Sequence, residues 1–279
     1  MIGGTPAGTL PAPARLVSHP VLRVAVQTQA IQPSYILHAR PYRETSLLLE
    51  AFSRDHGRVG LVARGARGGR GQARRALLQP LQPLLLTWAG RGELMNLRSV
   101  EAASAALSLR GHALLCAFYV NELLVRLLPR GEPQDELYWR YTVCLGQLAE
   151  PGAQLGWQLR RFERDLLRLL GYGLELDMAA DDGAPLEARM RYVFEAEAGP
   201  YQVATPTRSG AGGISGSSLI CLREDRPPDA RGLRELRGLM RAVLLHHLDG
   251  RPLRTWAVLD GVNEGMRAGA KPVADQDAS

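Results

Sequence analysis

The chain has 279 residues, of which 46% are hydrophobic and 22% charged. This composition supplies enough apolar material for one large core or two modest ones, and too much for a disordered chain. No segment approaches the roughly 18 consecutive apolar residues of a membrane span, and the N-terminal segment lacks the basic region and apolar stretch of a secretory signal. The sequence therefore excludes a transmembrane protein and predicts a cytosolic protein of one or two domains.

The positive charge is concentrated in one part of the chain. The net charge is +6, and 33 of the 34 Lys and Arg residues are arginines. Residues 31–100 hold 11 arginines against four acidic residues, so this segment carries +7 and the rest of the chain −1. A basic segment joined to a near-neutral remainder favours a polyanionic partner for that segment. From charge alone, a basic face that is simply solvated is an equally good interpretation.

The pattern after the first 32 residues is that of a small β domain. Residues 1–32 are rich in Gly, Ala and Pro, which predicts a flexible leader. Residues 33–104 contain short apolar runs separated by glycine-bearing turns, which predicts strands over 35–39, 46–52, 59–63, 84–88 and 94–100. Residues 64–71 are too glycine-rich for a helix or strand and too basic to be buried. Together with Arg74 and Arg75, they predict a mobile basic loop.

Residues 105–258 have helical periodicity instead. Apolar residues recur at helical spacing over 106–128, 135–149, 154–170 and 230–248. A small β-hairpin is predicted from 190–196 and 201–204, and residues 259–279 are predicted to be a flexible tail. The predicted fold class is therefore α+β: a five-stranded barrel of the OB-fold type, followed by an α-helical bundle domain with a small hairpin insertion.

Motifs of the common enzyme classes are missing from the sequence. The glycine-rich segment 65–71 is not followed by Lys and Ser/Thr, which excludes a nucleotide-hydrolysing P-loop. The three cysteines form no Cys-x-x-Cys pair, and His246 and His247 are adjacent, so they point about 100° apart on a helix. No Gly-x-Ser-x-Gly elbow is found. We therefore expect no enzymatic activity, no metal and no cofactor.

The β domain itself predicts nucleic-acid binding. An OB-type barrel commonly receives single strands on its open face and loops. Aromatic residues on which bases could stack are few, namely Tyr35, Tyr42, Phe52 and Trp88. Binding should therefore be mainly electrostatic and only weakly dependent on sequence. The candidate DNA-binding residues are Arg40, Arg43, Arg58, Arg64, Arg67, Arg70, Arg74 and Arg75.

A series of short motifs, in the same order along the chain, resembles the RecO family of bacterial DNA repair proteins. The resemblance spans about 35–252 and rests on ILHARPY (36–42), SLLLEAF (46–52), GRV (57–59), LVARGAR (61–67), LQPLLL (81–86), GRGE (90–93), LRS (97–99), YVNELL (119–124), LRRFE (159–163) and LGYG (170–173). Some members of this family carry a four-cysteine zinc module after the motif matched by 170–173. Residues 177–188 contain no cysteine, so this chain resembles the zinc-free branch.

The resemblance implies a function and a set of partners. Family members bind single- and double-stranded DNA, anneal complementary strands, bind RecR, and help RecA to replace single-stranded-DNA-binding protein (SSB) in gap repair. It also implies a bacterial cytoplasmic protein that is associated with the nucleoid. Our main hypothesis is a non-enzymatic recombination mediator. The alternative is an adaptor that acts mainly through protein contacts of its helical domain, with incidental DNA affinity.

The resemblance further implies that the acidic, Phe-ending tail of SSB docks on the helical domain. The third predicted helix offers positive charge from Arg160, Arg161 and Arg164, and apolar surface at helical spacing from Phe162, Leu166 and Leu169. Guanidinium groups can bind a carboxylate through two parallel hydrogen bonds. The alternative interpretation is that these three apolar residues belong to the bundle core and that the arginines are solvated.

Overall fold

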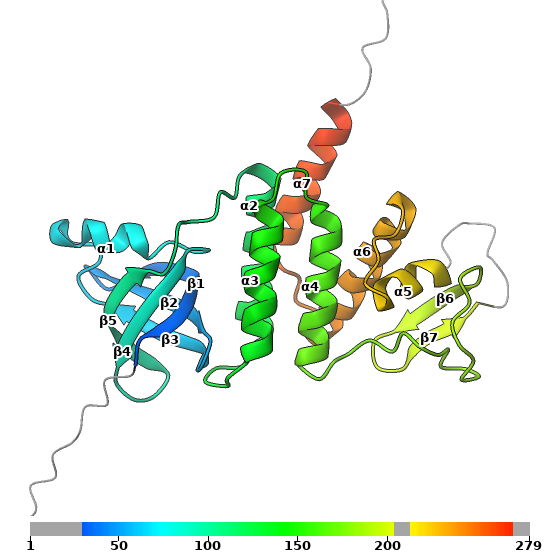
Figure 1. The fold of residues 1–279 in the computed structure, drawn as a ribbon, viewed down its shortest axis with the longest axis horizontal. Coiled ribbons are helices and arrows are strands. Elements are labelled where there is room, and N and C mark those ends of the chain that lie inside the picture. The colour runs from blue at the N-terminus through cyan, green and yellow to red at the C-terminus, as the bar shows by residue number, and fades with distance from the viewer. Residues whose placement is uncertain (1–29, 204–212, 270–279) are drawn as a thin grey trace, which may run out of the picture.

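The computed structural model describes residues 30–203 and 213–269. A β-barrel lies at one side of the molecule, a group of helices follows it, and a small sheet lies at the other side (Figure 1). Nearly all of the predicted leader, 1–32, and residues 270–279 of the predicted tail lie outside the described residues. None of the helices in the described ranges is long and apolar enough to cross a membrane.

The N-terminal domain is a closed barrel of five strands: β1 (Gln32–Tyr42), β2 (Ser46–Ser53), β3 (Gly57–Ala63), β4 (Pro83–Ala89) and β5 (Leu94–Ala102). Their order is β1-β2-β3-β5-β4, with β1 and β4 closing the barrel and β3 and β5 paired in parallel. Side chains such as Leu49, Leu61 and Trp88 fill the interior with no exposed surface. The predicted five-stranded OB-type barrel is confirmed.

The connection between β3 and β4 is partly helical, which the sequence did not predict. Gly69–Gly71 (η1) forms a turn of 3-10 helix, and Gln72–Leu77 forms the short helix α1. The guanidinium of Arg74 on α1 donates to the carbonyl oxygens of Leu97 and Arg98, at 3.0 and 3.3 Å. The predicted basic loop is therefore a loop only in its first half, because the second half is a helix tied to β5.

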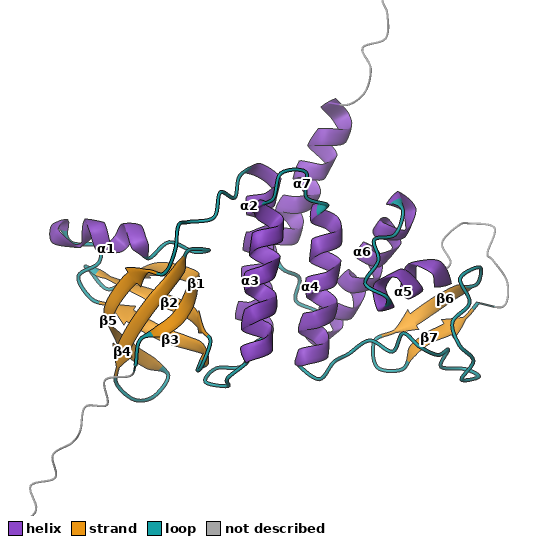
Figure 2. Cartoon of the chain, viewed as in Figure 1, coloured by secondary structure: helices purple, strands orange, loops and turns teal. Residues whose placement is uncertain are grey.

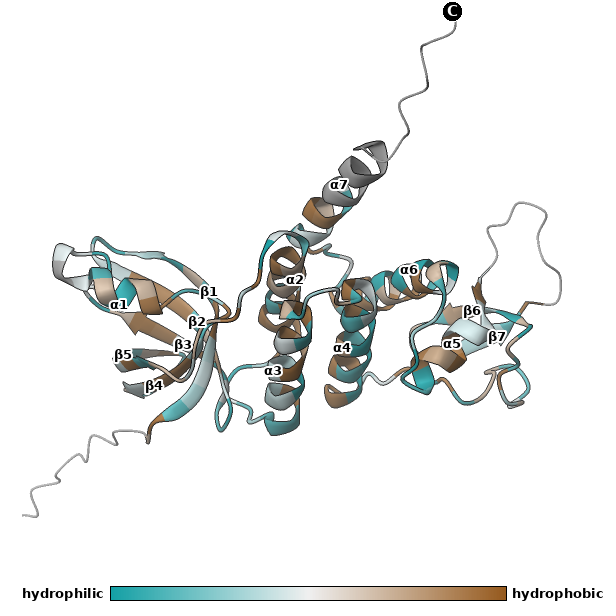
Figure 3. Ribbon diagram, turned by 45° about the horizontal axis from the view of Figure 1, so that its top comes forward, coloured by the Kyte–Doolittle hydropathy of each residue, from teal (hydrophilic) through white to brown (hydrophobic). Residues whose placement is uncertain are grey.

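The helical domain begins with three helices close to their predicted bounds: α2 (Gly111–Leu127), α3 (Asp135–Ala149) and α4 (Leu155–Leu169). Apolar residues, brown in Figure 3, are frequent on the barrel strands and on α2. Buried side chains of the helices form one core with Tyr35 and Phe52 of the barrel. The ring of Tyr35 lies edge-on to that of Tyr141, with centroids 5.0 Å apart. The barrel is therefore packed against the helices through a shared aromatic core.

Polar contacts also fix the barrel against the helices. The side-chain amide of Asn121 donates to the carbonyl oxygen of Leu37 at 2.9 Å and accepts from the Tyr141 hydroxyl at 2.7 Å. Gly57, with φ at +62°, lies at the start of β3, where a Cβ would be 1.8 Å from the carbonyl oxygen of Glu132. Only glycine permits this conformation together with such a close approach.

The C-terminal part adds a small sheet and further helices (Figure 2). The predicted hairpin is formed by β6 (Arg191–Glu195) and β7 (Gly199–Gln202). A third strand, β8 (Ile214–Ser215), pairs with β6 and was not predicted. The helices are α5 (Gly216–Arg223), α6 (Ala230–His247) and α7 (Arg254–Gly269).

Helix α7 occupies part of the predicted tail. The sequence predicted a flexible segment from residue 259, but α7 runs through 254–269. Its start is held by Glu122 of α2, whose carboxylate accepts from the backbone N–H groups of Arg254 and Thr255, both at 2.9 Å. A carboxylate at a helix N-terminus accepts hydrogen bonds from otherwise free backbone N–H groups and interacts favourably with the positive end of the helix dipole. The first turn of α7 is therefore fixed to the helical core.

Candidate nucleic-acid interface

Four of the predicted arginines lie exposed at one end of the barrel. Arg40 is on β1, Arg43 is in the turn between β1 and β2, and Arg64 and Arg67 follow β3. The backbone N–H of Arg67 donates to the carbonyl oxygen of Thr45 at 2.8 Å, and its guanidinium donates to that of Arg43 at 3.3 Å. The turn and the connection after β3 therefore lie side by side. We call Arg40, Arg43, Arg64 and Arg67 the basic end of the barrel.

Helix α1 and β5 extend this basic surface. Arg75 is exposed on α1, and Arg98 is exposed on β5. Arg98 was not among the predicted residues, although it lies in the LRS motif. Arg74 is less exposed than Arg75, because its guanidinium binds the carbonyl oxygens of β5. Arg70 lies in η1, and its side chain is outside what the structure describes.

Arg58, another of the predicted DNA-binding arginines, is largely buried and is held by contacts within the protein. Its Nε donates to the carbonyl oxygen of Leu128 at 2.8 Å, and its Nη1 binds Oε2 of Glu50 at 3.2 Å. Arg130 pairs with the other carboxylate oxygen of Glu50. The Arg58 side chain is 16% exposed, and burial lowers its pKa. Arg58 thus joins the barrel to the segment between α2 and α3.

The aromatic residues of the barrel are mostly unavailable for base stacking. Tyr35, Phe52 and Trp88 are buried. Tyr42 is half-buried beside the basic end, with the guanidinium carbon of Arg43 5.2 Å from its ring centroid. One aromatic ring gives little stacking energy compared with a groove lined by several. The basic end is therefore suited to contacts with phosphates more than with bases.

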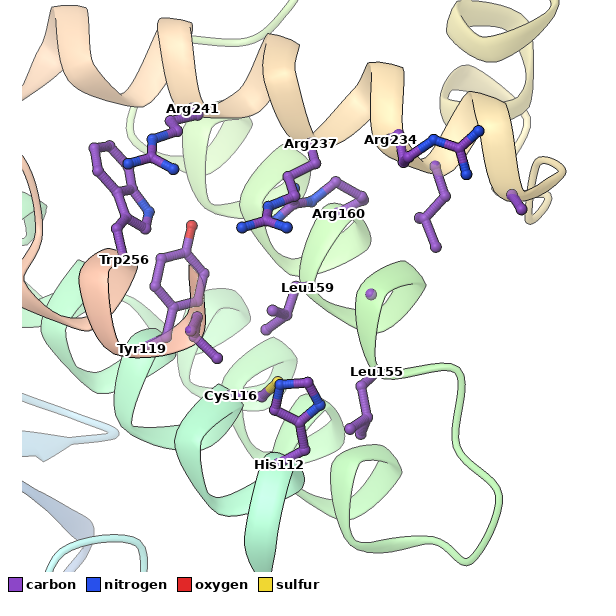
Figure 4. Close-up of a pocket in the computed structure, with 14 residues that line it drawn as sticks. His112, Cys116, Tyr119, Leu155, Leu159, Arg160, Arg234, Arg237, Arg241 and Trp256 are labelled. Carbon is purple, nitrogen blue, oxygen red and sulfur yellow. The ribbon is translucent and has the colours of Figure 1, made fainter. Parts of the chain in front are cut away.

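The predicted partner site on α4 divides between two sides of the helix. Phe162 is 3% exposed and packs in the core, so it offers no docking surface. Arg161 binds both carboxylate oxygens of Asp225, at 2.8 and 2.7 Å. Arg164 binds Asp225 as well, at 3.1 Å, so both arginines hold the segment after α5. Arg160 points elsewhere and lines a cavity (Figure 4).

This cavity has a volume of about 300 Å³ and lies between α2, α4, α6 and α7. It combines apolar walls with several guanidinium groups. The side chain of Arg241 lies over the ring of Trp256, 4.8 Å from the ring centroid (Figure 4). Arg234 and Arg241 are exposed, so the cavity can be reached from the surface of α6. The apolar and basic lining residues are Leu155, Leu159, Leu233, Trp256, Leu259, Arg160, Arg234, Arg237 and Arg241.

Acidic side chains bind most of these arginines. Arg160 pairs with Glu163, which also accepts from the Tyr119 hydroxyl at 2.6 Å. Glu163 has no exposed surface, and burial raises its pKa despite these partners. The Nε of Arg160 is buried with no hydrogen-bond partner in the described part of the chain. Arg237 and Arg241 both bind Asp260 of α7.

Two family models match the chain along most of its length. The model described as "Recombination protein O N terminal" matches residues 27–106, and "Recombination protein O C terminal" matches 109–257. The chain belongs to the RecO family of DNA repair proteins. Its curated relatives include the DNA repair protein RecO of Stenotrophomonas maltophilia, 47% identical over 81% of this chain and 94% of that protein. RecO of Nitrosococcus oceani is 44% identical over 82% of this chain and 92% of the relative.

Residues in two of the motifs that resemble RecO stabilise the fold of this chain. In the motif YVNELL, Asn121 binds the barrel and Glu122 holds the start of α7. In the motif LRRFE, Phe162 and Glu163 are buried while Arg160 lines the cavity. Sequence reasoning selected LRRFE for its charge, but it missed Arg237, Arg241 and Trp256. The signal that could have found the two arginines is their spacing of four, which places them on one face of a helix, whereas no such spacing marks Trp256.

Proposed function

We propose that this RecO-family chain is a non-enzymatic recombination mediator in the bacterial cytoplasm. It binds single- and double-stranded DNA through the basic end of the barrel, anneals complementary strands, and helps RecA to replace SSB. RecR is a further protein partner, supported by the family resemblance alone. The observation that carries the DNA-binding proposal is the basic end itself, where four exposed arginines lie at the end of β1, in the turn after it and in the adjacent connection after β3.

The chemistry of the basic end fits strand annealing. A duplex carries one negative charge per roughly 1.7 Å of its axis, so two single strands repel each other as they approach. Arginines that bind phosphates reduce this repulsion without reading the bases. Because Tyr42 is the one barrel aromatic that is not buried, the bases of a bound strand stay free to pair. The same site would thus hold a strand and permit its pairing.

Annealing of two complementary labelled strands by the purified protein, without nucleotide, tests this proposal. We expect acceleration over the spontaneous rate. A variant with Arg43, Arg64, Arg67 and Arg75 all changed to Gln should lose it. An adaptor that works only through protein contacts would leave the annealing rate at the spontaneous value, and that result would overturn the mediator proposal.

We also propose that the acidic, Phe-ending tail of SSB docks in the cavity between α2, α4, α6 and α7. The terminal phenyl ring would enter the apolar part, and carboxylates would meet the arginines. The support is the charge and shape of the site: leucine side chains line the walls, and Arg160 has a buried Nε with no partner among the described residues. Unsatisfied buried donors favour a ligand that accepts from them.

Adjacent arginines on α4 provide a matched pair of variants. Arg160→Gln removes a guanidinium from the cavity, whereas Arg161→Gln removes one that faces Asp225. With a labelled acidic peptide ending in phenylalanine, R160Q should weaken binding roughly 30-fold, the scale of an anchor contact. R161Q should change it less than about two-fold. Circular dichroism confirms folding, and equal loss in both variants would place the tail elsewhere.

A further inference from the structure

Two arginines of the cavity are already bound to a carboxylate of the chain itself. Asp260, on the second turn of α7, pairs with Arg237 through one oxygen and with Arg241 through the other, at 2.8 Å in the latter case. Arg237 and Arg241 are four residues apart on α6, so their guanidinium groups lie on one face of that helix. The arrangement is that of two arginines sharing one bound carboxylate.

We infer that Arg237 and Arg241 form a carboxylate-binding subsite that Asp260 occupies in the free protein, and that an acidic ligand entering the cavity must displace Asp260 from it. This inference rests on the proposed docking of an acidic peptide in the same cavity. It adds a competitor supplied by the chain. The affinity for an acidic ligand then depends on how much more strongly its carboxylate binds Arg237 and Arg241 than the carboxylate of Asp260 does.

The surroundings of Asp260 distinguish it from the other acidic residue in this region. Glu163 is wholly buried beneath Arg160 and accepts from Tyr119, so it is a fixed part of the core. The Asp260 side chain is 33% exposed, and its partners are 42% and 43% exposed. Ion pairs of that exposure are weak and are screened by salt. Asp260 can therefore leave Arg237 and Arg241 at small cost, whereas Glu163 cannot leave Arg160.

Position on α7 also connects Asp260 to the apolar part of the cavity. Trp256 and Leu259, from the same helix, line the cavity wall. Arg241 lies over the Trp256 ring as well as binding Asp260. A ligand carboxylate that replaced Asp260 would therefore sit next to the apolar wall. The subsite thus favours a peptide in which an acidic residue lies close to a bulky apolar one.

The test compares Asp260→Asn with Asp249→Asn. Both remove one negative charge, but Asp249 is exposed at the end of α6 and does not line the cavity. Asn also tolerates the positive φ of +53° at position 249. With the labelled acidic peptide at low salt, D260N should bind roughly three- to ten-fold tighter than wild type, as expected for release of two exposed ion pairs. D249N should bind like wild type.

Two further measurements test whether the tighter binding of D260N arises at Arg237 and Arg241. A peptide with its acidic residues replaced by their amides and with an amidated C-terminus, but the same terminal phenylalanine, should bind D260N and wild type equally. In an R237Q/R241Q background, D260N should give no gain, because the competitor has lost its site.

The outcomes separate this inference from the proposal on which it rests. If wild type binds the acidic peptide and R160Q does not, while D260N binds it no better than wild type, the cavity is the docking site and the competitor role of Asp260 is refuted. Weaker binding by D260N would refute that role too. If wild type does not bind the acidic peptide at all, both the docking proposal and the subsite fail.

Discussion

Replacing the exposed arginines of the barrel should flatten the salt dependence of DNA binding. Of the seven predicted DNA-binding arginines whose side chains the structure describes, five are exposed: Arg40, Arg43, Arg64, Arg67 and Arg75. If each neutralises one phosphate of a single strand, the slope of log affinity against log salt is about −3.5, at about −0.7 per contact. Affinity should then fall roughly 100-fold between about 50 and 200 mM salt.

The fourfold variant R43Q/R64Q/R67Q/R75Q leaves one of these contacts. Its slope should be about −0.7, so the same rise in salt should weaken binding only about three-fold. Fluorescence anisotropy with a labelled single strand, titrated at several salt concentrations, measures both slopes. Binding at low salt should also weaken to a similar degree for strands of different sequence, because phosphate contacts carry no sequence information.

A control variant with the same change in net charge lies on the helical domain. Arg189, Arg226, Arg231 and Arg251 are exposed there and lie far along the chain from the barrel. Changing these four to Gln should leave the slope near −3.5, as five phosphate contacts require. If the two fourfold variants lose slope equally, binding reflects overall charge and not the basic end. An unchanged slope in the barrel variant would refute the assignment of these residues outright.

Asn121→Ala leaves the buried Tyr141 hydroxyl and Leu37 carbonyl without partners, so urea denaturation should show a loss of roughly 2–4 kcal/mol. Burial opposes ionisation of Glu235, but hydrogen bonds from Ser215 and its other partners outweigh it and lower its pKa to about 2. Because the pKa of Glu235 is lower in the folded state than in the unfolded state, its ionisation stabilises the fold above about pH 4.5, and this stabilisation is lost as the pH falls towards 2. Glu235→Gln should therefore lower the free energy of unfolding by roughly 2–3 kcal/mol at neutral pH. In this variant the free energy of unfolding should also decline less steeply between pH 4.5 and 2. Because the sequence has no four-cysteine set, chelator treatment should leave the melting temperature unchanged, and stoichiometric zinc by elemental analysis would contradict this.

Elements with strong local signals could be predicted from the sequence. Helix α6 begins one residue after Asp229, whose carboxylate caps it, and its apolar residues recur at helical spacing. The barrel strands were recognisable from short apolar runs between glycine-bearing turns. Helix α1 was not, because it has only six residues, follows a glycine-rich segment and is held by Arg74 binding to β5. A helix that depends on a tertiary contact leaves no local pattern.

The candidate site was predicted in outline but not residue by residue. Eight arginines of one segment have similar sequence surroundings, yet Arg58 is held by Glu50 and by a carbonyl oxygen 70 residues away. Only the packing of the barrel against α2 and α3 creates that environment. On α4, neighbouring positions differ by about 100° around the helix. Whether Arg160 or Arg161 faces the cavity therefore depends on where α6 and α7 pack.

The central claim, that DNA is held at the basic end of the barrel, is tested most directly by protection of arginines from a dicarbonyl reagent. The full-length protein is modified with and without a saturating single strand, and modification is measured at each arginine by mass spectrometry. We predict protection of Arg43, Arg64, Arg67 and Arg75, with Arg189, Arg226 and Arg231 modified equally in both samples. Protection confined to the helical domain, with the barrel arginines unchanged, would contradict the claim.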